Sequence, residues 1–383
     1  MEEWKEYKLS DICDYGKDRI EVSSLDNSNY ISTENMLPNR AGVTTATTLP
    51  TGELTPSFKI DDTLVSNIRP YFKKIWKATF SGGCSADVLV FKAKENVSKE
   101  YLYYVLADDE FFKYSMTTSK GTKMPRGDKN SIMNYPIKLP PLPTQQKIAA
   151  ILSSLDDKIE LNNKINTNLE QQAQALFKNW FVDFEPFGGK MPEGWKVGKL
   201  SDVLRLKKNP IQPGEDTSLP YLPNLPIDLI PIKSLAIREV RPNEEALSSL
   251  LRFEENDILI GTMRVYFHRV AIAPFDGITR TTCFVLEPFN PKYFAYAAIT
   301  CNQDLAIDYA QKTSKGSTMP YAVWEGGLGD FEIPIPDEVT AEKFNNIVEP
   351  FLEQIKKSYF ENKNLQELRE SLLPKLMNGE IEV

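Results

Sequence analysis

The sequence predicts an α+β protein in which a mixed α/β domain followed by a long helix occurs twice. Two observations lead to this fold class. Four short blocks of sequence recur in the same order about half a chain apart, and an apolar stripe with helical spacing follows each copy. A chain of 383 residues suits two to three domains of ordinary size, each able to bury a core of its own.

The internal repeat covers the globular part of each copy. Its spacing is regular, because the four blocks recur at an offset of roughly 191 to 196 residues. The recurring blocks are Trp4–Ile12 as Trp195–Val203, Asp62–Phe72 as Asp257–Phe267, Thr118–Pro125 as Thr313–Pro320, and Ile137–Pro140 as Ile333–Pro336. Coincidence does not easily produce four matches in order, so the chain is predicted to be an internal duplication.

Within the globular parts, short β-branched or aromatic runs bounded by turn residues predict strands. These runs are Leu64–Ser66, Val88–Phe91, Ile258–Ile260 and Cys283–Leu286. Residues 100–113 and 293–309 are expected to be helical. The predicted layout is therefore globular parts at 1–143 and 188–336, with long helices at 144–187 and 337–383.

Each long helix is predicted from apolar residues that recur close to every 3.5 positions on a polar background. The first stripe is Ile148, Ile151, Leu155, Ile159, Leu169, Ala173, Leu176 and Trp180. The second is Phe344, Val348, Phe351, Ile355, Leu365, Leu368 and Leu372. Such stripes are typical of a coiled coil, and we expect the two helices to pair antiparallel as a spacer between the domains.

Local signals suggest where these helices begin and end. Thr144 and Thr340 follow proline-rich turns and are expected N-caps. The Pro and Gly-Gly of residues 184–189 should end the first helix, and Pro374 should kink or end the second. Asn162 and Asn166 lie in the first stripe, where they either fix the register of the pair or line a hydrated seam.

Composition excludes several function classes. Hydrophobic residues make up 41% and charged residues 26% of the chain, no apolar run approaches about 18 residues, and the first residues lack the pattern of a secretory signal. A cytoplasmic protein without a membrane segment is expected. The four cysteines, Cys13, Cys84, Cys283 and Cys301, are scattered and His268 is the single histidine, so disulfides, structural zinc and histidine-based catalysis are not expected.

Motifs of catalysis and cofactor binding are also missing from the sequence. Lys120-Gly121-Thr122 lacks the upstream glycine of a phosphate loop, and no glycine-rich cofactor loop follows a first strand. The sequence also lacks the Asn/Asp-Pro-Pro-aromatic tetrapeptide with which amino-methyltransferases hold a flipped base. We therefore expect a non-catalytic chain that binds no cofactor or metal, with any chemistry carried by partners.

The net charge of −8 argues at first against a nucleic-acid partner, but the positive residues are clustered. Segments 69–74 and 264–269 interleave cations with aromatics, and segments 119–123 and 314–317 combine lysine, glycine and hydroxyl groups that suit a DNA phosphate. The predicted DNA contacts are Arg69, Tyr71, Lys73, Lys74, Ser119, Lys120, Gly121, Thr122, Lys123, Arg264, Tyr266, His268, Arg269, Ser314, Lys315, Gly316 and Ser317.

Each of these segments also has a purely structural interpretation. The lysine-glycine segments match simple turns that need a glycine with positive φ. The cation-aromatic segments match strands that alternate core rings with solvated charges, and His268 matches an incidental surface residue. The aromatic group Trp180, Phe181, Phe184 and Phe187 fits packing against a neighbouring domain better than contact with a partner protein.

Several stretches resemble the specificity subunits of type I restriction-modification enzymes. They are Pro140–Asn162, Ala173–Lys178, Trp180–Phe187, Leu372–Leu376 and Asn378–Ile381. The resemblance spans the chain and includes its duplicated layout. It implies two target-recognition domains that read a bipartite, asymmetric site on double-stranded DNA, separated by the helical spacer. It also implies two adenine-methylating subunits and ATP-dependent translocase-nuclease subunits as partners, which would carry S-adenosylmethionine and ATP.

Two other functions remain open at this point. One is a DNA-modifying enzyme with an embedded methyltransferase, against which the missing cofactor loop counts. The other is a coiled-coil scaffold that never touches DNA, against which the paired cation-aromatic segments count weakly.

Overall fold

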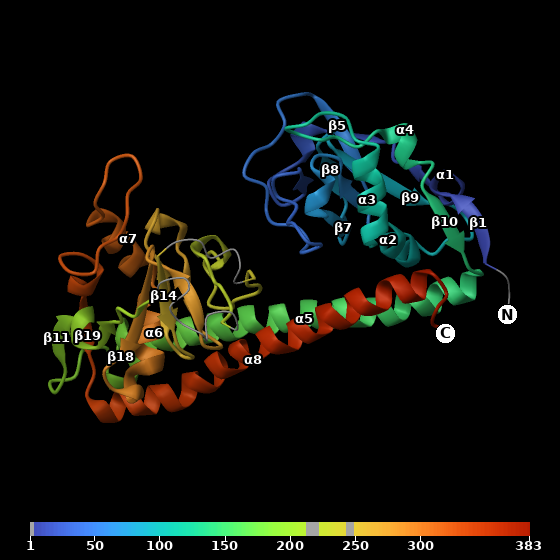
Figure 1. The fold of residues 1–383 in the computed structure, drawn as a ribbon. Coiled ribbons are helices and arrows are strands. Elements are labelled where there is room, and N and C mark those ends of the chain that lie inside the picture. The colour runs from blue at the N-terminus through green and yellow to red at the C-terminus, as the bar shows by residue number, and fades with distance from the viewer. Residues whose placement is uncertain (1–3, 212–221, 243–248) are drawn as a thin grey trace. The chain divides into compact units, whose positions relative to one another are not determined.

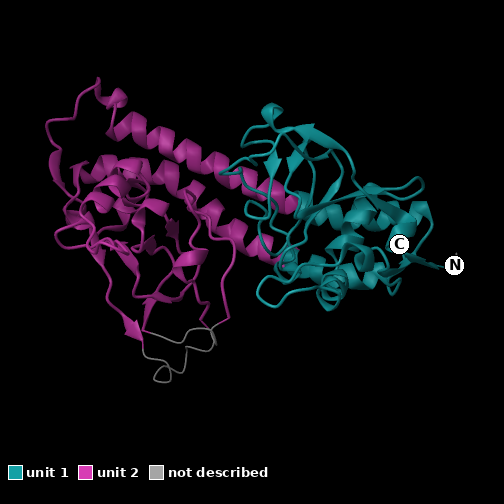
Figure 2. Cartoon of the chain, turned by 90° about the horizontal axis from the view of Figure 1, so that it is seen from above, with its two compact units in different colours: residues 1–157, 366–383 teal, residues 158–365 magenta. Residues whose placement is uncertain are grey.

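The computed structural model describes residues 4–211, 222–242 and 249–383, which fold as two compact units (Figure 2). The first unit comprises residues 1–157 and 366–383, and the second comprises residues 158–365. Each unit therefore contains one globular part together with segments of both long helices. Each is described below by itself.

The globular part of the first unit is built from three sheets. One has the antiparallel order β2-β9-β6-β7, another has the order β3-β5-β8-β4, and β1 pairs with β10. The strands are β1 (Lys5–Lys8), β2 (Cys13–Tyr15), β3 (Arg19–Glu21), β4 (Tyr30–Ile31), β5 (Leu54–Phe58), β6 (Thr63–Ser66), β7 (Ile75–Lys77), β8 (Gly82–Cys84), β9 (Val88–Ala93) and β10 (Pro136–Leu139).

The second unit repeats this topology. Its sheets have the orders β12-β18-β15-β16, β13-β14-β17 and β11-β19, so that each strand follows its counterpart in the first unit, apart from β4. The strands are β11 (Lys196–Lys199), β12 (Leu204–Leu206), β13 (Pro210–Ile211), β14 (Leu250–Phe253), β15 (Ile258–Gly261), β16 (Val270–Ile272), β17 (Gly277–Arg280), β18 (Cys283–Pro288) and β19 (Glu332–Ile335). The duplication read from the sequence is therefore a duplication of fold, and the four predicted strands are confirmed as β6, β9, β15 and β18.

A short helix packs on the sheet β2-β9-β6-β7 of the first unit, and another packs on the sheet β12-β18-β15-β16 of the second (Figure 1). The α-helices are α1 (Leu9–Ile12), α2 (Lys99–Ala107), α3 (Asp109–Thr117) and α4 (Lys129–Ile132) in the first unit, and α6 (Phe294–Cys301) and α7 (Asp304–Lys312) in the second. The one-turn 3₁₀ elements are η1 (Val22–Ser24), η2 (Pro70–Phe72), η3 (Glu185–Phe187), η4 (Leu200–Asp202), η6 (Ile227–Leu229), η8 (Val265–Phe267), η9 (Pro291–Tyr293) and η10 (Leu328–Asp330).

The two helices predicted within the globular parts are each broken in two. Asp108 takes an extended conformation between α2 and α3, where its carboxylate accepts a hydrogen bond from the Glu110 N–H and caps the second helix. Gln303 is extended in the same way between α6 and α7. A helical periodicity that continues through a cap residue hides such a break, so the prediction of single helices was wrong.

The long helices are α5 (Leu142–Phe181) and α8 (Glu338–Met377). They run antiparallel within the second unit, because Asn162 bonds to Asn362 while the rings of Phe181 and Phe344 lie 4.8 Å apart. Within the first unit, Asp156 pairs with Arg369 at 2.6 Å. The predicted antiparallel pairing is confirmed.

The ends of α5 and α8 correct two predictions and exclude one alternative of a third. Both predicted N-caps lie inside helices, because α5 already begins at Leu142, and the residue that caps α8 is Asp337, whose carboxylate accepts from the Thr340 N–H at 2.9 Å. Thr144 and Thr340 are therefore not caps. Pro374 does not end α8, which continues to Met377. The predicted end of α5 is close to that observed.

The inward face of the helix pair is less apolar than the stripes predicted. Ile151 and Leu368 are exposed, whereas Leu152 and Leu373 are buried in their place in the first unit. In the second unit, the buried Asn162 amide donates to Glu361 Oε2 and Asn362 Oδ1, both at 2.8 Å. These bonds across the pair favour the register role of Asn162 over a hydrated seam, because they form only when the two helices are aligned.

Aromatic packing joins the end of α5 to the second globular part. The buried ring of Phe181 lies 5.6 Å from Trp195 and 4.7 Å from Tyr296, and Trp180 packs 6.0 Å from Phe187. Packing against the neighbouring domain is thus the observed role of this aromatic group. No helix of the described ranges combines the length and apolarity needed to cross a membrane.

Candidate nucleic-acid interface

The predicted segment 69–74 of the first unit forms a closed 3₁₀ turn, η2, between two left-handed residues. Arg69 and Lys73 both have φ near 50°. The Phe72 N–H donates to the Arg69 carbonyl at 3.0 Å, and the Lys73 N–H donates to the Pro70 carbonyl at 2.8 Å. Left-handed backbone at residues other than glycine costs about 1–3 kcal/mol each and persists only where the surroundings fix it. The surrounding structure therefore fixes the conformation of this turn.

The second unit repeats this turn as η8. Arg264 and His268 have φ of 49° and 52°, and the Phe267 N–H donates to the Arg264 carbonyl at 2.9 Å. The strained conformation is thus retained in both copies, although the residues differ at some positions. Strain that recurs at one place in a duplicated fold points to a functional segment.

A loop from the second predicted segment lies beside the turn. In the first unit, Lys120 and Arg126 exchange backbone hydrogen bonds of 2.9 and 3.0 Å, which closes the loop, and the Arg69 N–H donates to the Pro125 carbonyl at 2.8 Å. Gly121 has a φ of +92°, a conformation that other residues rarely adopt. Two segments far apart in the sequence are thereby joined at one site.

The same loop stands beside the turn of the second unit. Lys315 and Tyr321 exchange hydrogen bonds of 2.9 Å in both directions, and the Arg264 N–H donates to the Pro320 carbonyl at 2.8 Å. Gly316 has a φ of +88°. We call this combination the turn-loop frame, comprising residues 69–74 with 119–126 in the first unit and residues 264–269 with 314–321 in the second.

Both frames expose consecutive aromatic rings. Tyr71 is 48% and Phe72 37% exposed, with their ring centroids 4.6 Å apart, and Tyr266 and Phe267 repeat this arrangement at 4.9 Å. A strand would have turned one ring of each pair inward. The interpretation of these segments as alternating strands is therefore wrong.

Two lysines of the first frame are tied to the protein. The Lys73 ammonium pairs with Asp109 at 2.8 Å, and the Lys74 ammonium donates to the Thr33 carbonyl at 2.7 Å. Burial, and then the nearby charge of Arg69, lower the pKa of Lys74. These side chains brace the turn and have less freedom to meet a phosphate.

The loop lysine of the first frame, Lys120, is largely exposed but has an acidic partner. Its ammonium lies 2.8 Å from Asp128 Oδ2. This contact raises the pKa of Lys120 and lowers that of Asp128 to about 2, with the Ser131 N–H as a further donor to the carboxylate. Lys123 is exposed on the same loop, and within residues 4–211, 222–242 and 249–383 it forms no ion pair.

The second frame corrects the interpretation of His268 as a surface residue. The imidazole is buried, with Nδ1 at 3.1 Å from Asp304 Oδ1 and Nε2 at 2.8 Å from Asn302 Oδ1. Its position corresponds to Lys73, and Asp304 corresponds to Asp109. His268 therefore braces the turn, as Lys73 does, and its buried ring is not presented to DNA as the sequence predicted. Arg269 is also held, since its guanidinium donates to the Asp228 carbonyl at 3.0 Å.

The remaining predicted side chains are more accessible. Arg264 and Lys315 are exposed, and among the described residues neither forms an ion pair with a carboxylate. Ser119 and Ser314 are half-buried and donate their hydroxyl protons to helix carbonyls, those of Met116 and Ala310, both at 2.8 Å. The last group, at the loop tips, is exposed: Gly121, Thr122, Gly316 and Ser317.

Comparison with known proteins agrees with a duplicated DNA-reading fold. The model of the type I restriction modification DNA specificity domain matches twice, at residues 1–171 and 192–368. The chain belongs to this family. The two matches correspond to the two copies, and domains of this family recognise a DNA target.

Two relatives among characterised proteins are also specificity subunits. The MjaIX specificity subunit of Methanocaldococcus jannaschii is 30% identical over 316 residues, which cover 76% of this chain and 71% of the relative. The HindI specificity subunit of Haemophilus influenzae is 25% identical, with both chains covered completely. The fold is similar to that of the type I S subunit from M. genitalium, with a TM-score of 0.57, 15% identity, and coverage of 98% of this chain and 96% of that one.

The DNA contacts predicted for this specificity subunit did not include Arg126, in the first frame, or Asp87, beside it. Arg126 Nη2 lies 2.7 Å from Asp87 Oδ1, at the mouth of the loop. Arg126 lies beyond the predicted segment 119–123, and the second copy has Tyr321 at its position, so comparing the two copies did not single it out. The partnership with Asp87 depends on strand pairing, and no short motif in the sequence signals it.

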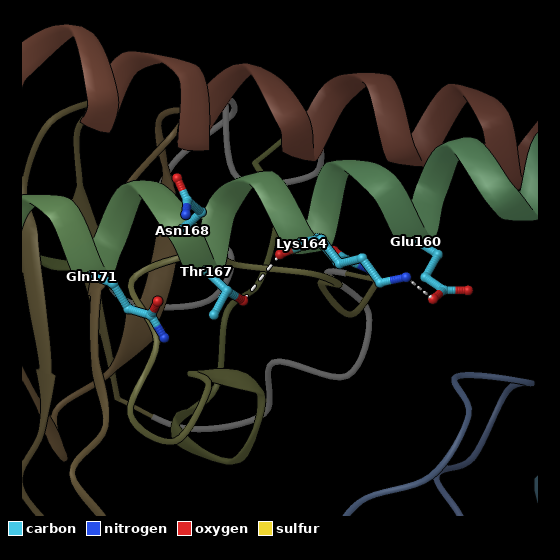
Figure 3. Close-up of a pocket in the computed structure, with 6 residues that line it drawn as sticks. Glu160, Lys164, Thr167, Asn168 and Gln171 are labelled. Atoms are coloured by element: carbon cyan, nitrogen blue, oxygen red, sulfur yellow. Dashed lines mark hydrogen bonds and ion pairs between the residues drawn. The ribbon is translucent and has the colours of Figure 1, made fainter. Parts of the chain in front are cut away.

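Elsewhere on the specificity subunit, a shallow polar hollow lies along one face of α5 in the second unit (Figure 3). It is lined by Glu160, Asn163, Lys164, Thr167, Asn168 and Gln171. Lys164 pairs with Glu160 at 2.5 Å, and the Thr167 hydroxyl donates to the Asn163 carbonyl at 3.0 Å. The charges of Lys164 and Glu160 thus neutralise one another.

The thiols of the described residues are buried, and no cluster of three His, Cys, Asp or Glu side chains there is placed to hold a metal ion. Burial raises the pKa of Cys13, Cys84 and Cys283 to about 12, so these groups stay protonated near neutral pH and are poor nucleophiles.

Proposed function

We propose that this chain reads a bipartite, asymmetric sequence on double-stranded DNA and positions the methyltransferase and restriction subunits of a type I complex. In this assignment, residues 1–143 and 188–336 are the two target-recognition domains, and residues 144–187 and 337–383 form the spacer. The chain itself is non-catalytic and acts in the cytoplasm. S-adenosylmethionine and ATP bind to partner subunits, and this chain needs neither cofactor nor metal.

The observation that supports this proposal best is the turn-loop frame, which is built twice on the same backbone but with different side chains. Two frames of one geometry engage DNA in equivalent ways, and their different side chains select different bases. A scaffold that never touches DNA has no reason to keep a strained turn with exposed aromatic rings in both copies.

Several side chains that are similar in the two frames have the chemistry of contacts that position a protein on DNA without reading its sequence. We assign phosphate contacts to Lys120 and Lys315, and to Arg69 and Arg264 at the turns. Tyr71 and Tyr266 offer exposed rings for sugar and base edges. The exposed loop tips approach the backbone through Gly121 and Thr122 in one frame and through Gly316 and Ser317 in the other.

The duplication also bears on partners. Two copies of a domain and helix offer two equivalent docking surfaces, so we expect two methyltransferase subunits for each copy of this chain, with restriction subunits joining that core. Native mass measurement of the complex tests this ratio. A stable complex with a single methyltransferase subunit would contradict the proposed pseudo-symmetry.

The spacer is tested by lengthening both helices together. Seven residues inserted between Asn162 and Leu169, with a matching heptad near Asn362, add about 10 Å to the pair, or roughly three base pairs. Methylation-site sequencing should then show both half-sites unchanged and the unspecified gap longer by about two to four base pairs. Half-sites that change while the gap stays fixed would show that the helices do not set the spacing.

A further inference from the structure

The two frames share a backbone but differ in the side chains at two neighbouring positions. In the first unit, Arg126 faces Lys120 across the loop, and the Asn67 N–H donates to the Asp87 carbonyl at 2.8 Å. Arg126 Nη2 lies 2.7 Å from Asp87 Oδ1 beside the closing pair of the loop, and the two side chains remain 57% and 32% exposed. A charged pair is thus presented at the edge of the frame.

In the second unit, the same backbone positions carry Tyr321 and Thr282. Tyr321 faces Lys315 across the loop, and the Thr262 N–H donates to the Thr282 carbonyl at 2.9 Å. The hydrogen bonds that fix these positions therefore match those of the first unit, whereas a phenol and a hydroxyl replace a guanidinium and a carboxylate. A change of side chains on a fixed backbone is the arrangement expected where each copy selects its own bases.

We propose that Arg126, oriented by Asp87, reads a G·C base pair in the half-site of the first domain. This inference rests on the proposed function. Arginine has five N–H donors, and the contact of Arg126 Nη2 with Asp87 leaves a planar edge free to donate two bonds to guanine O6 and N7. The second oxygen of Asp87 can accept from the amino group of cytosine, so the pair suits both bases.

A phosphate contact or a purely structural role fits Arg126 less well. A phosphate contact common to both frames does not need this ion pair, because the second copy has a phenol and a hydroxyl in its place, and Lys120 and Arg69 already offer positive charge in the same frame. An exposed ion pair contributes little to stability, so folding does not explain why one is held at this edge. Orienting a fork for base recognition uses both members of the pair.

The second frame lacks this means of reading guanine. Tyr321 is 42% exposed and has one hydroxyl in place of the fork, and Thr282 offers a hydroxyl and a methyl group, which suits contact with the thymine methyl. The half-sites should therefore differ at the base pair that these positions face.

The test uses the full chain assembled with its methyltransferase subunit, and reads the target by methylation-site sequencing and by binding to duplexes changed at one base pair at a time. Arg126→Lys keeps the charge and loses the fork, and should lower discrimination at one G·C pair of a single half-site by about tenfold to a hundredfold. Asp87→Asn should weaken discrimination at the same pair. The other half-site should be unaffected.

Lys123→Thr provides the matched control, because it removes a cation from the same loop and installs the residue of the second copy. It should weaken binding to all sequences and leave the motif unchanged. If Arg126→Lys keeps the full motif, or changes affinity equally for all sequences, Arg126 does not read a base. If the unmodified complex shows no bipartite motif, the proposed function itself fails, so the two failures are distinguishable.

Discussion

Replacing Asp128 by asparagine should strengthen the binding of non-target DNA. The Asp128 carboxylate has two roles: Oδ2 neutralises the Lys120 ammonium at 2.8 Å, and Oδ1 accepts from the Ser131 N–H at 3.0 Å as the cap of α4. Asparagine serves as a helix cap about as well as aspartate, so Asp128→Asn keeps the fold and removes only the charge. In the unmodified chain Lys120 must leave Asp128 before it meets a phosphate, and without that carboxylate it can make the contact with non-target DNA as well.

The size of the effect follows from counterion release. One additional phosphate contact steepens the dependence of log affinity on log salt concentration by about 0.9. Raising salt from roughly 50 to roughly 200 mM should therefore cost the variant about 3.5-fold more affinity than it costs the unmodified chain. The pKa of Asp128 lies at about 2, so its charge is fully present at neutral pH and the substitution removes all of it.

Fluorescence anisotropy with a labelled duplex that lacks the target measures this slope for the assembled complex. Asp18→Asn is the matched control, because Asp18 forms a similar exposed pair with Lys92 at 2.6 Å in the same unit, outside the frame. An unchanged slope in Asp128→Asn, or an equal change in both variants, would refute the reasoning, since the second result would reflect net charge alone.

Two further predictions concern the second unit. Lys315→Ala should reduce the slope of log affinity against log salt concentration by about 0.9 without altering base preference, because Lys315 forms no ion pair with the described carboxylates. A slope equal to that of the unmodified chain would show that Lys315 does not contact DNA. Glu170→Gln should flatten the pH dependence of stability. Burial raises the pKa of Glu170 above its ordinary value of 4.5, so the folded chain binds the proton more tightly than the unfolded chain does. The stability of the unmodified chain therefore falls as pH rises from about 4.5 through the pKa of the folded state. Denaturant unfolding at a series of pH values measures this loss, and parallel profiles for both chains would contradict it.

The sequence alone was sufficient to predict the duplication, because two copies of one fold keep the residues that their common backbone requires. Gly121 and Gly316 illustrate this, since both take a positive φ that few other residues tolerate. Runs such as Val88–Phe91 are buried on both sides, and their local pattern is enough to predict strands. The helices of the antiparallel pair were predictable for a similar reason, because the spacing of apolar residues that indicates each helix lies within one continuous stretch of sequence.

The sequence was less informative about helix faces and breaks. A period of 3.5 residues places Ile151 and Leu152 almost equally well, and only packing against the first globular part decides that Leu152 is buried. Polar residues such as Asn162 can occupy the inner face because α8 supplies their partners. Those partners lie some 200 positions away in the chain, outside the reach of any local pattern.

The tertiary structure alone decided how the candidate site is composed. The turn and the loop of each frame meet through backbone bonds such as that from Arg69 to Pro125, which no side-chain motif encodes. Contacts between residues that are distant in the sequence also bury His268 against Asn302 and place Asp87 beside Arg126. The charge of a side chain is fixed by its chemistry, but its freedom to meet DNA depends on which neighbours the fold places within hydrogen-bonding distance.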